Sequence, residues 1–65
     1  MRITLNGVSE DCAAATLAEL LQSLDLANAA IATALNGSFI RRDQRAATPL
    51  HEGDAVEIVA PMQGG

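Results

Sequence analysis

The carboxylate that ends the chain, on Gly64-Gly65, is the group best suited to chemistry. Glycine has no Cβ, so a Gly-Gly ending can thread a narrow channel and adopt almost any backbone angle. A terminal carboxylate has a pKa of about 3.5 and is ionised at neutral pH. It could attack the α-phosphate of ATP to form an acyl-adenylate, and a persulfide could then displace the adenylate to leave a thiocarboxylate. Taken alone, however, this ending fits a frayed terminus or a vector remnant better than a reactive site.

The residues before the terminal glycine set how far its carboxylate reaches. Pro61 cannot donate to a sheet ladder, so it marks the end of a preceding strand. From there the tail spans about 15 Å if it is extended. We therefore expect residues 1–60 to form a docking body and residues 61–65 a flexible tail, with Gly65 as the site of adenylation and of the thiocarboxylate. The residues expected to thread a partner's active site are Met62, Gln63 and Gly64.

The other potentially reactive side chains have simpler interpretations. Cys12 could carry a persulfide or a thioester, but no neighbouring His or Arg run would lower its pKa, so a small apolar side chain is favoured. His51 has no nucleophile or ligand partner and is expected to be solvated. One Cys and one His cannot form a structural zinc site, and no Gly-rich phosphate loop is present. We expect no metal and no bound cofactor, with ATP held by a partner. Asp54 and Glu57 are interpreted as surface charges rather than a catalytic pair.

The size and charge of the chain exclude several classes of function. A chain of 65 residues is too small for a large cleft enzyme. Its net charge is −4, and the only basic cluster is Arg41, Arg42 and Arg45, for which a solvated loop is favoured over pairing with an acidic partner surface. The first residues lack the apolar core of a signal peptide, and the longest apolar stretch, 26–35, is too short to span a bilayer. We expect a cytoplasmic protein that binds neither nucleic acid nor membrane.

The first half of the chain predicts a hairpin followed by a helix. Alternating apolar and polar residues predict a strand over 1–5, and Asn6-Gly7 predicts a tight turn because both residues tolerate positive φ. A weaker strand over 8–12 then returns. Thr16 begins a helix as a capping box, in which its hydroxyl accepts from the Glu19 amide and Glu19 reaches back to the Thr16 amide. The apolar stripe of this helix consists of Leu17, Leu20, Leu21 and Leu24.

The second half predicts another hairpin and a final strand. Asn36-Gly37 repeats the turn chemistry of the first hairpin and joins a buried strand over 31–35 to a strand over 38–40. The remaining segments are an irregular polar connection over 41–50, a turn at 52–54 and a strand over 55–60 with Val56 and Ile58 on one face. The order hairpin, helix, hairpin, strand predicts an α+β fold of the β-grasp (ubiquitin-like) type. In it, one main helix packs on one face of a mixed sheet of four to five strands.

Four parts of the chain occur in a recognisable order. They are the capped helix over 16–24, Leu35-Asn36-Gly37, the stretch 52–58, and the ending Met62-Gln63-Gly64-Gly65. Together they resemble the ThiS family of bacterial thiamine-pathway sulfur carriers over essentially the whole chain. The resemblance implies a β-grasp fold, and a ThiF-like adenylyltransferase that adenylates Gly65. It also implies a persulfide donor, either a cysteine desulfurase or a rhodanese-type protein, and transfer of sulfur from Gly65 to thiazole synthase, ThiG.

By this resemblance the chain is a co-substrate of partner enzymes rather than an enzyme. The small subunit of molybdopterin synthase has a similar fold and tail, but it is usually longer and often has more apolar, proline-containing residues before Gly-Gly. A ubiquitin-like modifier, which forms isopeptide bonds with target lysines, is an alternative from another class. An interaction module with an inert tail is a further alternative.

Overall fold

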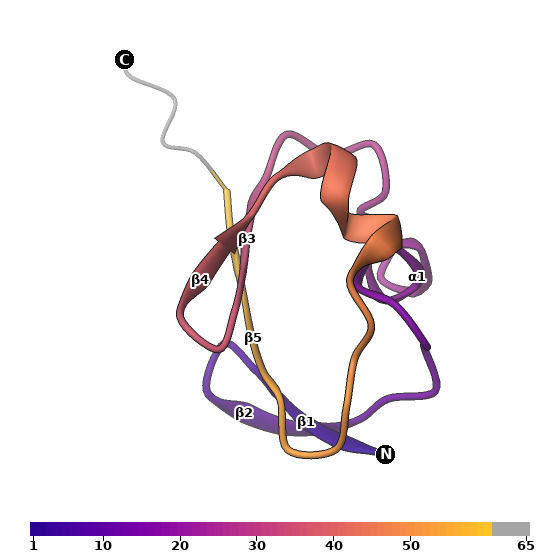
Figure 1. Ribbon diagram of the computed structural model, residues 1–65, viewed down its shortest axis with the longest axis vertical. Helices are drawn as coiled ribbons and strands as arrows, with labels where there is room; N and C mark the ends of the chain where they lie inside the picture. The colour runs from indigo at the N-terminus through magenta and orange to yellow at the C-terminus, as the bar shows by residue number, and fades with distance from the viewer. Residues whose placement is uncertain (61–65) are drawn as a thin grey trace.

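Five strands and two helical segments form from residues 1–60, the part of the chain that the computed structural model describes. In chain order they are β1 (Arg2–Leu5), β2 (Val8–Asp11), α1 (Leu17–Ser23), β3 (Ala32–Leu35), β4 (Ser38–Ile40), the 3-10 helix η1 (Arg42–Ala47) and β5 (Ala55–Val59). The sheet has the order β2-β1-β5-β3-β4, with β1 parallel to β5 and the other pairs antiparallel. Helix α1 lies on one side of this sheet (Figure 1). Within residues 1–60, neither helical segment is long and apolar enough to cross a membrane.

Both hairpins turn through Asn-Gly pairs, as predicted. Asn6 and Gly7 have φ angles of 50° and 82°, and Asn36 and Gly37 have φ angles of 50° and 84°. Positive φ at both central residues is typical of type I′ turns, whose twist matches that of the flanking strands. Each turn also sets the register of its hairpin, and therefore which side chains face the helix. The predicted α+β fold with one mixed sheet and one main helix is confirmed.

Helix α1 begins at the predicted cap, with one difference in its hydrogen bonds. The Thr16 hydroxyl accepts from the Glu19 N–H at 3.2 Å. Glu19 Oε1, however, accepts from the Ala15 N–H at 3.0 Å, so the predicted bond to the Thr16 amide is wrong by one residue. The chain enters the helix in an extended conformation, because the Leu50 N–H donates to Ala15 O. This geometry brings the Ala15 amide within reach of the glutamate.

The hydrophobic core lies between α1 and the inner face of the sheet and is aliphatic. Its buried members are Ile3, Cys12, Leu17, Leu20, Leu50 and Val56. Leu24 does not complete the predicted buried stripe: it is the C-cap of the helix and is 40% exposed. The single aromatic side chain, Phe39, is 68% exposed and contributes nothing to the core.

A buried arginine joins η1 to strand β3. Arg45 is 5% exposed, and it donates from Nε to Thr33 Oγ1 at 3.1 Å and from Nη2 to Ile31 O at 2.8 Å. The prediction that Arg45 belongs to a solvated loop is therefore wrong, because η1 carries it back against the sheet. Arg41 and Arg42 are exposed, as predicted. The predicted buried strand over 31–35 is only partly correct, since Thr33 is buried whereas its neighbour in the strand, Ala32, is exposed.

Candidate functional site

The predicted tail over residues 61–65 lies outside the described residues. This applies to Gly65, the expected site of adenylation, and to Met62, Gln63 and Gly64, which are expected to thread a partner's active site. The structure describes the point from which this segment starts, at the end of β5. In Figure 1 the yellow end of β5 lies on the side of the molecule away from the N-terminus.

Strand β5 reaches the tail from the middle of the sheet. It lies between β1 and β3, and its last described pairing joins Val59 to Ala32. Val56 is 1% exposed and packs in the core, so side-chain packing also anchors the strand to the body. Backbone pairing with β1 covers only Ala55 and Val56, whereas pairing with β3 continues to Val59, and these bonds together restrict the motion of the strand. The end of β5 at Val59 therefore has a defined position in the folded body.

Two asparagine side chains extend the pairing of β5. Asn6 Oδ1 accepts from the Ile58 N–H at 2.8 Å, and its Nδ2 donates to Ile58 O at 3.2 Å, beyond the end of β1. Asn36 Oδ1 accepts from the Ala55 N–H at 2.9 Å at the other end of the strand. A primary amide can do this because it offers both a donor and an acceptor. Sequence reasoning assigned both residues to turns alone, although the repeated Leu-Asn-Gly was an available signal.

Exposed apolar side chains lie on the outer face of the sheet beside the end of β5. The cross-strand register places Val59 next to Ala32, and Phe39 next to Ala34, on the face opposite α1. Val59 is 58% exposed and Phe39 is 68% exposed. We call these four residues the exit face. Exposed apolar surface of this kind is typical of protein contact sites, and this one adjoins the origin of the tail.

Asp54 stabilises the turn before β5. Its Oδ1 accepts from Asn36 Nδ2 at 3.0 Å, and its Oδ2 accepts from the His51 N–H at 2.8 Å. These two hydrogen bonds, that from Asn36 first, lower the pKa of Asp54 below its ordinary value of 3.8. The Asp54 side chain is 14% exposed, so the predicted surface charge is partly covered by the turn that it stabilises. Glu57 is exposed, as predicted, and the His51 side chain is 74% exposed, which confirms its expected solvation.

Cys12 has the buried position expected of a small apolar side chain. It is 6% exposed and belongs to the core, and its Sγ lies 3.8 Å from Ala14 O. Within residues 1–60, no three His, Cys, Asp or Glu side chains gather as metal ligands would.

A mixed sheet folded on one helix, with its central strand leading to a Gly-Gly ending, defines a ubiquitin-like β-grasp protein. The chain belongs to the ThiS family, whose model matches residues 3–65. The matched range includes the predicted reactive residue, Gly65. Proteins of this family are small sulfur carriers, and membership supports that role for this chain.

Two solved structures of one bacterial protein resemble this chain along its whole length. The crystal structure of the thiamine biosynthesis protein ThiS from Geobacter metallireducens has a TM-score of 0.85 and 36% identity, covering 100% of both chains. A solution NMR structure of a thiamine biosynthesis protein from the same organism has a TM-score of 0.79 and 36% identity, covering 100% of this chain and 88% of the other. No curated protein sequence matched the chain.

Proposed function

We propose that the chain is a sulfur carrier of thiamine biosynthesis that acts in the cytoplasm and supplies sulfur for the thiazole ring. The observation that carries the proposal is the ThiS family match, which extends through the Gly-Gly ending. The rigid central position of β5 supports it, because a carrier must present its acyl group at a fixed point of its body. The chain then acts as a co-substrate of partner enzymes rather than as an enzyme.

The proposed chemistry takes place at the Gly65 carboxylate. A carboxylate oxygen attacks the α-phosphate of ATP, and pyrophosphate leaves. The terminal sulfur of a persulfide attacks the acyl carbon and AMP leaves, which gives an acyl disulfide. A thiol reductant then cleaves the S–S bond, is itself oxidised to a disulfide, and leaves the thiocarboxylate. Thiazole synthase takes the sulfur from this thiocarboxylate.

The proposed partners supply what this mechanism needs. A ThiF-like adenylyltransferase would hold ATP and the tail, a cysteine desulfurase or rhodanese-type protein would supply the persulfide, and thiazole synthase ThiG would accept the sulfur. The exit face supports docking of such partners, since Val59 is exposed at the end of β5 and Phe39 is exposed on the same face of the sheet. The net charge of −4 favours partner surfaces that are basic.

Intact mass spectrometry tests the proposal directly. The full chain is incubated with ATP, a ThiF-like enzyme, a persulfide donor and a thiol reductant. Parallel samples lack ATP or contain a chain from which Gly65 is deleted. We expect a mass change that corresponds to one oxygen replaced by sulfur, in the complete sample only. An unchanged mass with an enzyme that adenylates another ThiS-family chain would contradict the proposal. Adducts on lysines of other proteins would indicate a modifier instead.

Genetic rescue separates thiamine supply from molybdenum-cofactor supply. A bacterial strain that lacks its own ThiS-family gene and requires thiazole is complemented with this chain. Growth without added thiazole supports the proposal. Restoration of a molybdoenzyme in a strain that lacks the molybdopterin synthase small subunit, without restoration of thiazole synthesis, would assign the chain to the other pathway.

A further inference from the structure

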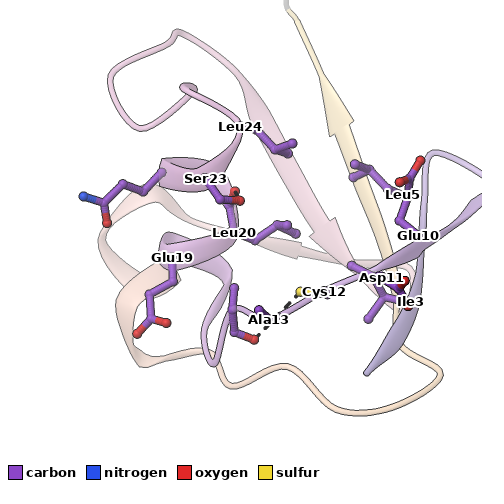
Figure 2. Close-up of a pocket in the computed structure, with 12 residues that line it drawn as sticks. Ile3, Leu5, Glu10, Asp11, Cys12, Ala13, Glu19, Leu20, Ser23 and Leu24 are labelled. Atoms are coloured by element: carbon purple, nitrogen blue, oxygen red, sulfur yellow. Dashed lines mark hydrogen bonds between the residues drawn. The ribbon is translucent and has the colours of Figure 1, made fainter.

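A groove separates helix α1 from the β1–β2 hairpin, on the opposite side of the sheet from the exit face. Its volume is about 630 Å³. Figure 2 shows Leu20 and Leu24 on the helix side converging with Ile3 and Leu5 on the strand side. Leu24 is 40% exposed at the mouth of the groove, so part of this apolar lining is accessible. An accessible apolar groove of this size can accommodate side chains of a bound segment.

The walls of the groove carry negative charge. Glu10 lies exposed on the strand side, and Glu19 lies exposed on the helix side, where its carboxylate also accepts from the Ala15 N–H. Asp11 also borders the groove, although its side chain pairs with Arg2 at 3.7 Å. The residues that line the groove include no Arg or His. A ligand with apolar groups and positive charge is therefore complementary to this surface.

Strand β2 borders the groove, and its outer edge offers backbone hydrogen-bonding groups. The Met1 ammonium donates to Cys12 O at 3.1 Å and the Cys12 N–H donates to Met1 O at 2.7 Å, so these two residues form a hydrogen-bonded pair. Hydrogen-bonded and non-hydrogen-bonded pairs alternate along an antiparallel ladder. The next pair, Arg2 with Asp11, is therefore non-hydrogen-bonded. Ile3 with Glu10 is then hydrogen-bonded, and Thr4 with Ser9, two positions beyond Arg2 with Asp11, is again non-hydrogen-bonded.

Two residues of β2 consequently direct their backbone groups away from the sheet. Ser9 and Asp11 point their N–H and C=O outward, because β2 is the edge strand of the described sheet. The Thr4 N–H, correspondingly, donates across to Asp54 O on the other side of β1 at 2.9 Å. An exposed edge of this kind can be extended by one more strand.

We propose that the groove and the β2 edge together bind an extended, basic segment of a partner protein. The segment adds to β2 as a further strand and hydrogen-bonds to the backbone of Ser9 and Asp11. Its alternate side chains lie on the helix side of the sheet, where apolar ones contact Leu20 and Leu24 and basic ones approach Glu10. A second copy of this chain is a poor occupant, because it would bring one acidic β2 edge against another.

This binding surface is separate from the proposed carrier chemistry. It uses neither the Gly-Gly ending nor the exit face, and its test needs no ATP and no activating enzyme. A negative result would therefore leave the sulfur-carrier proposal intact, and failure of sulfur loading would leave this surface intact.

Nuclear magnetic resonance titration tests the proposal on the full chain. The probe is a short, end-capped synthetic peptide that has Thr at every second position and Arg and Val in turn at the positions between, so that Arg and Val share one face of the added strand. Matched probes replace Arg by Glu, replace Val by Ser, or carry methyl groups on alternate backbone nitrogens. We expect the Arg-Val peptide to shift the amide signals of Ser9 to Asp11 and the methyl signals of Leu20 and Leu24. We expect each matched probe to bind at least about fivefold more weakly, because each lacks one of the three kinds of contact.

Protein variants give a second, independent readout. Glu10→Gln should weaken binding of the Arg-Val peptide about twofold to fivefold, whereas Glu57→Gln removes the same charge from the other face and should leave binding unchanged. Ser9→Pro removes one outward N–H without breaking the ladder to β1, and should also weaken binding about fivefold.

Three results would overturn the proposal. The first is a set of shifts spread over all the acidic residues, equally reduced by Glu10→Gln and Glu57→Gln, which would indicate charge attraction alone. The second is equal binding of the backbone-methylated probe, which would exclude strand addition even if Ser9→Pro fails to fold. The third is concentration-dependent dimerisation through β2 without peptide, which would assign the surface to a second copy.

Discussion

The asparagine side chains of the two tight turns have a second role, which is to hydrogen-bond to β5 near each of its ends. Asn6 and Asn36 adopt the positive φ angles that their turns require, and each also hydrogen-bonds through its side chain to β5. Asn36 in addition donates to Asp54, the carboxylate that stabilises the preceding turn. The strand that leads to the tail is therefore held at both ends by side chains from the two hairpins.

Asp54 should make the stability of the fold depend on pH in the acidic range. Its pKa is lowered in the folded chain, so the ionised carboxylate stabilises the fold above the unfolded value of about 3.8. That contribution is lost as the pH falls through the lowered folded value. Asp54→Asn should therefore lower the melting temperature at neutral pH and flatten its decline below about pH 4. Thermal unfolding between pH 2 and 7 measures this, and an unchanged acid profile would contradict it.

Arg45 should contribute to stability, although it has no carboxylate among its hydrogen-bond partners. Arg45→Met keeps most of the apolar stem but leaves Ile31 O without its donor, which should cost about 1–3 kcal/mol in the free energy of unfolding. The exposed Arg42 is the matched control, and Arg42→Met should change that free energy by less than about 0.5 kcal/mol. Urea denaturation of both variants checks the difference, and equal effects would show that burial of Arg45 does not matter.

At the scale of elements, β5 depends on Asn6 where β1 has already ended. Asn6→Gly keeps a residue that tolerates positive φ and removes only the side chain. The Ile58 amide should then exchange its hydrogen faster, while the domain stays folded. Asn36→Gly is the control, because it should affect the Ala55 amide instead. Hydrogen exchange measured residue by residue distinguishes the two, and unchanged exchange at Ile58 would contradict the role of Asn6.

Helix α1 should stabilise the body through its buried leucines and not through its last residue. Leu20 is 6% exposed, so Leu20→Ala should lower the free energy of unfolding by about 2–5 kcal/mol. Leu24→Ala should cost clearly less, since Leu24 is 40% exposed. Denaturant unfolding compares the two variants. Below its unfolding transition, Leu20→Ala should still be converted to the thiocarboxylate, because the tail chemistry does not involve the core.

For the whole molecule, folding and the proposed reaction should be separable. The sheet, the helix and the core are formed by residues within the described range 1–60. Deleting Gly65 should therefore abolish thiocarboxylate formation and leave the melting temperature within about 1 °C of that of the full chain. Intact mass and thermal unfolding of the same sample measure both. Unfolding of the deleted chain would show that body and tail are not independent.

The sequence by itself determined the features that depend on neighbouring residues. Both Asn-Gly pairs of this chain adopt positive φ, and Thr16 and Glu19 are within one helical turn of each other. Alternation of inward-facing and outward-facing side chains marks β5. The family resemblance could also be recognised from short motifs and their order. These signals are local, so they predicted both hairpins, the helix start and the final strand, and they identified Gly65 as the candidate reactive residue.

Only the tertiary structure decided the features that depend on residues far apart in the chain. Arg45 is buried because η1 packs against α1 and its side chain reaches Ile31 and Thr33, and Asn6 reaches Ile58 because β1 and β5 are adjacent in the sheet. The groove beside α1 likewise exists only once the hairpin and the helix are placed against each other. Such contacts join residues separated by many positions. The type and spacing of side chains do not indicate which distant backbone group will become the hydrogen-bond partner of a given side chain.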